Sequence, residues 1–495
     1  MKTSVCFFLA ALWAPAICSA QFPGTIENST FVVPLTNFAR IPNSGTGSAA
    51  PPRVNQVATA PNGTLFAMDQ RGPLYSITGG GATVTKYFDL NDYGVSLISS
   101  SEQGFQSFAF HPDFNTSGAA GFGKFYTAFS TSNTTPAPDF TAPGSDSHDE
   151  VIYEWTTSNP LASTFTPAVP ATPFRQVIRM EHPFANHNTG LLAFNPNATV
   201  GSADYGKLYI GVGDGGSGGD PLDLAQNRTN PFGSILRIDP LPASTAGVLS
   251  TNGQYRIPTN NPFRTGLADD TGSESETFAY GLRNPQRFSW DRGGAKTMFI
   301  ADIGQGSVEE INAGISGANY GWRRREGSFI YVSSGSVGPN ARDDAAASGF
   351  TYPLAEYDHS EGSAVTAGFV VRNGTVPGLE GKFLLSDFPS GKVFFFDADT
   401  LPDGGQDPLV QLRLSLNGTE STFLQMINAE RATQGLTAAG RADLRFGTDQ
   451  LGNIYFFNKQ DGVIRLLSVP EPTSAALLVL GAISVAARRR RPSRS

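Results

Sequence analysis

Short apolar runs, rich in aromatic and β-branched residues, recur along the chain. Each follows a glycine or another small residue and ends in a polar loop, as in GKLYIGVGDGG from Gly206 and GNIYFFNKQDGVIRL from Gly452. Runs of this length and composition predict short β-strands. The six clearest runs begin at Gly63, Gly123, Gly206, Ala295, Gly381 and Gly452.

Consecutive runs start 60, 83, 89, 86 and 71 residues apart. A period that long leaves room for several short strands per unit, which is typical of propeller blades with inserted loops. We therefore predict an all-β fold, a six-bladed β-propeller, over residues 21–468, and we expect no long helix there. The alternative is a sandwich of unrelated strands, which the repetition of one strand pattern disfavours.

Composition agrees with a turn-rich fold. The chain has 55 Gly and 34 Pro among its 495 residues, which favours many turns over long helices. Charged residues make up 16% of the chain, against roughly 25% in ordinary domains, which excludes a salt-bridged coiled coil. The net charge of −8 argues against nucleic acid as a partner.

The N-terminal segment 1–20 has the pattern of a secretory signal peptide. Lys2 precedes an apolar run that ends in small residues, Cys18-Ser19-Ala20. The alternative is a buried N-terminal strand. Both cysteines of the chain, Cys6 and Cys18, lie in this segment, so the processed chain would have neither a disulfide nor a cysteine–metal site.

The C-terminal segment 469–495 contains Pro-Glu-Pro from Pro470, a short apolar stretch and a cluster of arginines. These three parts, in this order, resemble the PEP-CTERM sorting tail of Gram-negative and related bacteria. The resemblance implies an exported protein whose tail is processed by a membrane exosortase. The alternative is a simple membrane anchor. Without both terminal segments the body has 29 basic and 42 acidic residues, an acidic balance that suits calcium binding.

Several common active-site motifs are absent from the sequence. It has no HExxH zinc motif, and no GxSxG nucleophile elbow sits between a strand and a helix. The glycine-rich GVGDGGSGGD follows a strand without opening a helix, so a dinucleotide or phosphate loop is not supported. We expect Asp214 and Asp220 in this loop to end turns, with calcium binding as the alternative. His187, flanked by amides just before a predicted strand, is a candidate base near neutral pH.

Seven further motifs occur in a fixed order over roughly residues 50–468. They are SEQG from Ser101, FAFHPDF from Phe108, AYGLRNPQRF from Ala279, DIGQ from Asp302, EEIN from Glu309, NYGW from Asn319 and EYDHSEG from Glu356. With the segment around His187, this ordered set resembles the soluble PQQ-dependent glucose/sorbosone dehydrogenase family. The family fold is a six-bladed propeller, in agreement with the repeat count.

The resemblance implies a role for the residues that match the family motifs. His187 would be the base that takes the proton of the anomeric hydroxyl, and Arg283 would stabilise charge on the reduced quinone, with Asn284 beside it. Glu102 and Asn186 would contact the substrate. The family has an acidic residue at the position of Asn186, and that residue helps to orient the base.

The resemblance also implies two kinds of bound cofactor. Gly304 and Gln305 would hold, through backbone carbonyls, the calcium that also binds the quinone. Glu310 and Tyr320 would form a second, structural calcium site. The basic partners of the three PQQ carboxylates are out of register with the family, and Lys392 and Arg441 are the candidates.

Our first interpretation is an exported, calcium-dependent PQQ dehydrogenase that oxidises an aldose and passes electrons to a separate acceptor. The main alternative is a propeller of the same family that has lost the cofactor and binds carbohydrate or protein at the cell surface. A calcium-dependent hydrolase or lactonase is a third possibility.

Overall fold

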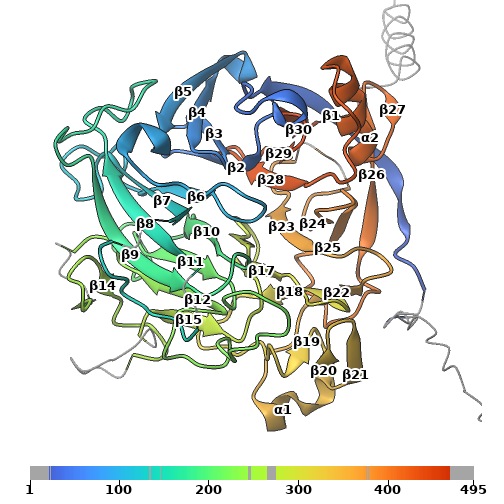
Figure 1. The fold of residues 1–495 in the computed structure, drawn as a ribbon. Helices are drawn as coiled ribbons and strands as arrows, with labels where there is room; N and C mark the ends of the chain where they lie inside the picture. The colour runs from blue at the N-terminus through green and yellow to red at the C-terminus, as the bar shows by residue number, and fades with distance from the viewer. Residues whose placement is uncertain are drawn as a thin grey trace, which may run out of the picture.

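The computed structural model gives a β-rich ring (Figure 1), and residues from around the ring line its central channel. The predicted signal peptide 1–20 and tail 469–495 lie outside the part of the chain that is described. Within that part, no helix is long and apolar enough to cross a membrane. The residues described are 22, 24–132, 135–144, 147–242, 247–264, 275–374, 376 and 378–468.

The first half of the ring consists of three blades, each a four-stranded antiparallel sheet. Blade 1 contains β2 (Val54–Thr59), β3 (Leu65–Asp69), β4 (Pro73–Thr78) and β5 (Thr83–Asp89). Blade 2 contains β6 (Phe105–Phe110), β7 (Lys124–Thr131), β8 (His148–Thr156) and β9 (Phe174–His182). Blade 3 contains β10 (Thr189–Phe194), β11 (Leu208–Val212), β12 (Ser234–Ile238) and β15 (Thr277–Tyr280).

The second half has the same plan. Blade 4 contains β16 (Arg287–Trp290), β17 (Met298–Asp302), β18 (Val308–Ala313) and β22 (Ala355–Asp358). Blade 5 contains β23 (Val365–Val370), β24 (Lys382–Asp387), β25 (Val393–Asp397) and β26 (Val410–Leu416). Blade 6 contains β28 (Arg445–Thr448), β29 (Ile454–Phe457), β30 (Val463–Leu467) and β1 (Asn28–Arg40).

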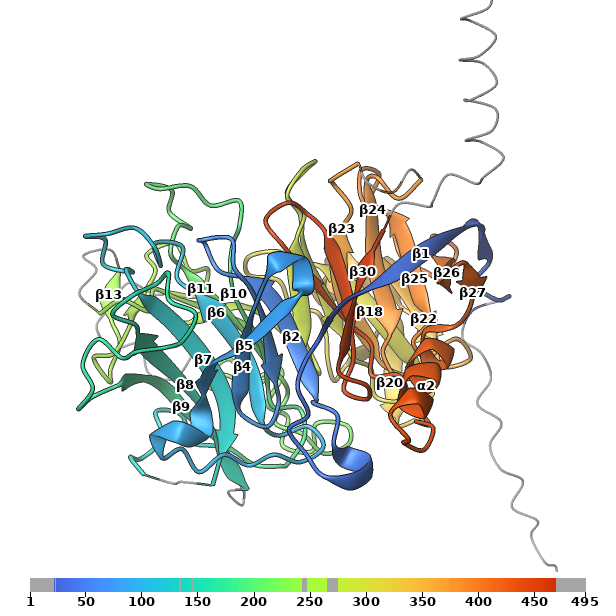
Figure 2. The ribbon, with the colours of Figure 1, turned by 90° about the horizontal axis from the view of Figure 1, so that it is seen from above.

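The ring is closed by the two ends of the described chain. The first strand of each blade contacts the first strand of the next, and β28 of blade 6 contacts β2 of blade 1. The outermost strand of blade 6 is the N-terminal β1, which pairs with β30 in antiparallel register, Leu35 opposite Leu467. Strand β1 also pairs in parallel with β26 of blade 5. Figure 2 shows the blue β1 beside the red β30 and the orange β26. The six-bladed propeller prediction is confirmed.

The core is divided into six apolar clusters, each lying between two adjacent blades. Successive side chains on a strand point to opposite faces of its sheet. In β3, Phe66 therefore packs toward blade 2, while Leu65 and Ala67 pack toward blade 6. Because both faces of a blade are buried, its second strand has apolar side chains on both faces. This double burial explains the repeated runs in the sequence, each of which corresponds to the second strand of a blade.

One helix of ordinary length lies between blades 5 and 6 and was not predicted from the sequence. Helix α2 (Phe423–Thr433) packs Phe423, Met426 and Ile427 against the cluster between blades 5 and 6. The Thr422 hydroxyl accepts from the Gln425 N–H, and the Gln425 side chain accepts from the Thr422 N–H. This capping box is a sequence signal for a helix start.

The remaining elements are short insertions. The strands are β13 (Val248–Leu249), β14 (Arg256–Ile257), β19 (Arg325–Glu326), β20 (Phe329–Ser333), β21 (Ser336–Asn340) and β27 (Thr419–Glu420). The helical turns are α1 (Ala345–Ser348) and the 3₁₀ segments Gly47–Ala49, Gly79–Gly81, Leu90–Tyr93 and Arg342–Asp344.

Shortening one buried side chain of β1 tests whether this strand closes the propeller ring. Leu35 is 1% exposed in the cluster between blades 5 and 6. We expect Leu35→Ala to lower the free energy of unfolding by about 2–5 kcal/mol, because it leaves a cavity at the closing strand. Thr36→Ala, on the exposed side of the same strand, should change it by less than about 0.5 kcal/mol. Urea-induced unfolding of both variants measures the difference, and equal effects would contradict closure by β1.

Candidate active site in the channel

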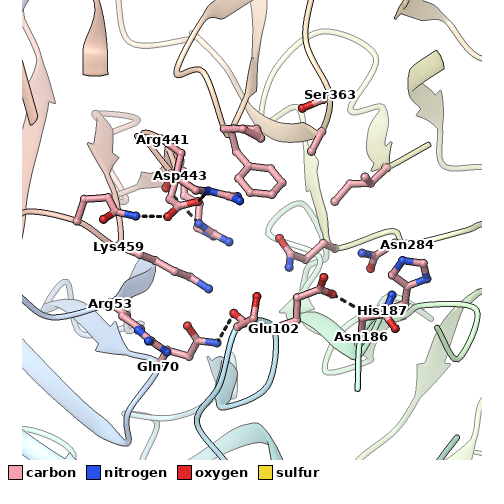
Figure 3. A pocket seen from close by; sticks show the side chains of 18 of the residues that line it. Arg53, Gln70, Glu102, Asn186, His187, Asn284, Ser363, Arg441, Asp443 and Lys459 are labelled. Atoms are coloured by element: carbon pink, nitrogen blue, oxygen red, sulfur yellow. Dashed lines mark hydrogen bonds and ion pairs between the residues drawn. The ribbon is translucent and has the colours of Figure 1, made fainter. Parts of the chain in front are cut away.

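A cavity of about 670 Å³ opens at one end of the channel (Figure 3). Strands in a blade alternate in direction, so the loop before its first strand and the loop between its second and third strands lie at the same end. The loop before the first strand of every blade lines the cavity, together with the loop between the second and third strands of blades 1, 4, 5 and 6. The predicted site residues among them are Glu102, Asn186, His187, Arg283, Asn284, Gly304, Gln305 and Arg441.

His187 lies in the loop before β10 and is 4% exposed. Its backbone is in the left-handed region, with φ of 58°, a conformation that costs a non-glycine residue about 1–3 kcal/mol. The strain is offset by contacts on both sides of the residue. Its N–H donates to Glu102 Oε2 at 3.0 Å, and its carbonyl oxygen lies 3.2 Å from His182 Nε2. The loop therefore holds the imidazole in one position.

The His187 ring is oriented by Asp214, from the loop between β11 and β12. His187 Nδ1 lies 2.6 Å from Asp214 Oδ1, and Trp322 Nε1 donates to Asp214 Oδ2 at 2.8 Å. Burial alone would raise the pKa of Asp214, but His187 and the Arg283 charge outweigh it and hold that pKa below its ordinary value. An ionised Asp214 accepts a hydrogen bond from the Nδ1–H of the neutral ring, so Nε2 is the unprotonated nitrogen, as a base requires.

The expectation that Asp214 only ends a turn was therefore incomplete. Its neighbour Asp220 fits the expectation, because its carboxylate accepts from the N–H groups of Leu224 and Ala225. The loop that contains His187 and the loop that contains Asp214 can lie close together because residue 213 is glycine. A Cβ at Gly213 would lie 2.2 Å from the His187 carbonyl oxygen, so only glycine fits there.

Arg283 and Asn284 precede β16 and are fixed by Asp302 at the end of β17. The two backbone N–H groups donate to the Asp302 carboxylate at 2.8 and 2.6 Å. The Arg283 guanidinium donates to the Ile303 carbonyl at 3.0 Å and to Gln305 Oε1 at 3.2 Å. The guanidinium is thus held at the cavity wall, where it can stabilise negative charge on a ligand.

Glu102 and Asn186 both line the cavity, and each also supports a loop. Glu102 accepts from the His187 N–H, as described above. Asn186 Oδ1 accepts from the Ser217 N–H at 3.0 Å, which ties the His187 loop to the glycine-rich loop that carries Asp214. Asn186 therefore does not take over the orienting role of an acidic neighbour; Asp214 does.

Gly304 and Gln305 lie at the turn between β17 and β18. Their N–H groups donate to Glu309 Oε2 at 3.2 Å and to Glu326 Oε1 at 2.9 Å, which fixes the peptide planes. Among the described residues, no donor reaches the carbonyl oxygen of either residue. Free carbonyl oxygens at a cavity wall are suitable calcium ligands, so these two residues fit the expected ion.

Glu310 and Tyr320 lie outside the cavity, in and beside blade 4. Glu310 is in register with Asp302 on one side and with Glu356 on the other. Burial, followed by the charges of Asp302 and Glu356, raises the pKa of Glu310 well above its ordinary value. A bound cation would compensate these carboxylates. No group of three or more His, Cys, Asp or Glu side chains converges as metal ligands in the described chain, so backbone carbonyls would have to complete this site.

The two basic candidates for the cofactor differ. Arg441 lines the cavity, over the ring of Phe388 at 5.2 Å. Lys392 does not line it, because its ammonium forms an ion pair with Glu361 Oε2 at 2.8 Å.

Arg53, Arg445 and Lys459 line the cavity instead and were not predicted. Lys459 lies between the second and third strands of blade 6, and Gln305 lies at the equivalent place in blade 4. The position of Lys459 in the repeated sequence pattern could therefore have marked it as a cavity residue.

Comparison with protein families agrees with this geometry. The family model described as "Glucose / Sorbosone dehydrogenase" matches residues 52–406, and the chain belongs to that family. It is 32% identical to the HIPL1 protein of Arabidopsis thaliana over 323 residues, 59% of this chain and 44% of that protein. It is 28% identical to the human Hedgehog-interacting protein over 232 residues, 46% of this chain and 28% of that protein. The chain thus spans less than half the length of these relatives.

Solved structures share the fold. The PQQ-bound aldose sugar dehydrogenase of Streptomyces coelicolor is similar with a TM-score of 0.50 and 20% identity, covering 87% of this chain and 96% of that chain. The apo-form of the soluble aldose sugar dehydrogenase of Escherichia coli is similar with a TM-score of 0.52 and 19% identity, covering 84% and 96%.

The lowered pKa values of two buried histidines should make the free energy of unfolding depend on pH. Burial lowers the pKa of His182 and of His111 to about 4, from about 6.5 in the unfolded chain. Between these values only the unfolded chain binds the protons, so stability should fall as pH drops from about 6.5 to about 4. Urea-induced unfolding at pH 7.5, 6 and 5 measures the slope.

Two variants identify the groups responsible for that slope. His182→Gln should reduce the slope, and an unchanged slope would contradict the assignment. His359→Gln should have the opposite effect on the slope. Burial opposes protonation of His359, but its hydrogen bond to Glu309 outweighs this and raises its pKa. His359 thus stabilises the fold at low pH, and its removal should steepen the slope.

Proposed function

We propose that this chain is an exported quinoprotein that oxidises the anomeric carbon of a sugar to a lactone and passes the electrons to a separate acceptor. The observation that carries the proposal is the His187–Asp214 pair, buried at the wall of a cavity next to the fixed Arg283 guanidinium. A base and an electrostatic stabiliser at one cavity are the groups that removal of a proton and a hydride from a sugar requires.

Each residue has a defined part in the proposed reaction. His187 Nε2 takes the proton of the anomeric hydroxyl, because Nδ1 is occupied by Asp214. Asp214 stabilises the imidazolium that forms. Arg283 and Asn284 with Arg441 would hold PQQ, and the carbonyls of Gly304 and Gln305 would hold its calcium. PQQ, when bound, supplies the acceptor for the hydride that leaves C1.

The two terminal segments support the proposal of export. The signal-peptide pattern of residues 1–20 and the PEP-CTERM-like segment 469–495 support delivery to the cell envelope and processing by an exosortase-type enzyme. Glu310 and Tyr320 would bind a second, structural calcium.

The second candidate function is a propeller that binds carbohydrate or protein without catalysis. One observation favours it: Lys392, an expected partner of the cofactor, is paired with Glu361 outside the cavity lining.

Cofactor titration separates the two candidates. With Ca²⁺ present, the purified protein should bind one PQQ, followed by its absorbance, and reduce an artificial acceptor in the presence of aldoses. His187→Gln should lower turnover by about 10²–10⁴-fold and leave PQQ bound. A folded, calcium-loaded protein that does not bind PQQ would overturn the dehydrogenase and favour the binding propeller.

The role of Asp214 has its own test. We expect Asp214→Asn to lower kcat by at least about 10²-fold, because an amide can favour the wrong imidazole tautomer and does not stabilise imidazolium. The affinity for PQQ should stay the same. Asp223→Asn, at an exposed carboxylate of the same loop, is the matched control and should leave kcat unchanged. Equal kcat in the Asp214 variant and the control would contradict the role.

A further inference from the structure

The cavity lining is more positive than the proposed cofactor requires. Seven basic and two acidic side chains line it. PQQ has three carboxylates, so a surplus of positive charge remains with PQQ bound, and calcium would increase it. The basic residues are Arg53, Arg71, Arg283, Arg431, Arg441, Arg445 and Lys459.

The two acidic residues of the lining are already engaged. Asp443 Oδ1 accepts from Arg441 Nε at 2.6 Å, and its other oxygen accepts from the Gln460 amide. Glu102 Oε2 accepts from the His187 N–H at 3.0 Å. Neither carboxylate is paired with Lys459 or Arg53.

Three of the cations have donors to spare. Within the described residues, the Lys459 ammonium has no hydrogen-bond or ion-pair partner, and Figure 3 shows it reaching into the cavity. Arg445 is 3% exposed, and its buried Nε has no partner. Arg53 donates from Nη1 to the Ser100 carbonyl at 2.8 Å. Burial, and then the Arg445 charge with smaller effects of Arg287 and Arg53, lower the pKa of Lys459, although the Asp443 charge opposes them. Like charges held together, with the nearby carboxylates already bonded to Arg441 and to the His187 N–H, form a site for an anion.

The position of this cluster separates it from most of the proposed cofactor contacts. Arg283, Asn284, Gly304 and Gln305 all belong to blade 4. Arg53 precedes the first strand of blade 1, which lies across the six-bladed ring from blade 4. Blade 1 adjoins blade 2, whose Glu102 lies on the expected substrate side. Arg445 and Lys459 belong to blade 6, as Arg441 does, and blade 6 adjoins blade 1. The cluster thus lies between Arg441 and the Glu102 side of the cavity, where the sugar is expected.

We infer that Lys459, Arg445 and Arg53 form a subsite for an anionic group of the sugar, so that the substrate is an acidic aldose with a carboxylate away from the reacting C1. This inference rests on the proposed function for the reaction, but its binding test does not need PQQ. The carboxylate would receive charge-assisted hydrogen bonds from the three cations, while the anomeric hydroxyl faces His187.

Calorimetry with matched sugars tests the subsite. The probes are D-glucuronate and D-galacturonate, each compared with its neutral counterpart, D-glucose or D-galactose. We expect the uronates to bind at least about tenfold more tightly than the neutral sugars, both with and without PQQ and Ca²⁺. Added salt should weaken the binding of the uronates and leave the binding of the neutral sugars unchanged. Equal affinity for charged and neutral sugars would overturn the inference.

Variants assign the effect to the cluster. Lys459→Gln should lower uronate affinity by about tenfold and leave neutral-sugar and PQQ affinities within about twofold. Arg53→Gln should act in the same direction. Lys86→Gln removes the same charge from the outer strand β5, where Lys86 lies near Asp89 and Asp92, and should change nothing.

The possible failures are distinguishable. If Lys459→Gln lowers the affinity for PQQ as much as the affinity for uronate, the cluster binds the cofactor. The subsite inference is then overturned, and the proposed dehydrogenase function is unaffected. If PQQ does not bind at all, the proposed function fails, and tight Lys459-dependent uronate binding would still support the subsite.

Discussion

Burial of both faces of every blade is the constraint on which the rest of the structure depends. A blade with two apolar faces needs a neighbour on each side, so the ring must close. Strand β1 closes it by pairing with β30 and β26, which joins the beginning and the end of the described chain. The loops at the mouth of the channel are then anchored to a closed scaffold, and this rigidity lets groups far apart in sequence meet with fixed geometry.

The site residues lie on two kinds of loop at one end of the propeller. They come from loops before first strands and from loops between second and third strands, which lie at the same end of every blade. His187 and Asp214 belong to these two kinds of loop in blade 3, and Asp302 ties the corresponding loops of blade 4 together. The strained His187 backbone is stabilised by Glu102 and His182 from blade 2. The geometry of such a site depends on neighbouring blades that hold their relative positions.

Much of the fold could be predicted from the sequence, because double burial makes the second strand of each blade a recognisable apolar run. The motifs around His187 and Arg283 likewise led to residues that line the cavity. Asp214 was not predicted as the partner of His187, because 27 residues separate them and only the pairing of β10 with β11 brings their loops together. Lys392 illustrates the opposite limit: its loop was correctly placed, but its ammonium turns to Glu361, a partner set by tertiary packing.

In the proposed reaction, His187 removes a proton from a sugar whose C1 hydride goes to PQQ. The most direct measurement is anaerobic single-turnover reduction of the PQQ- and calcium-loaded protein by a sugar that the protein binds, with hydrogen or deuterium at C1. We predict that the absorbance of bound PQQ changes to that of the reduced cofactor, more slowly with deuterium, and that His187→Gln slows this step by at least about 10²-fold. A loaded protein whose PQQ stays oxidised, or a His187→Gln variant that reacts as fast as the wild type, would contradict the account.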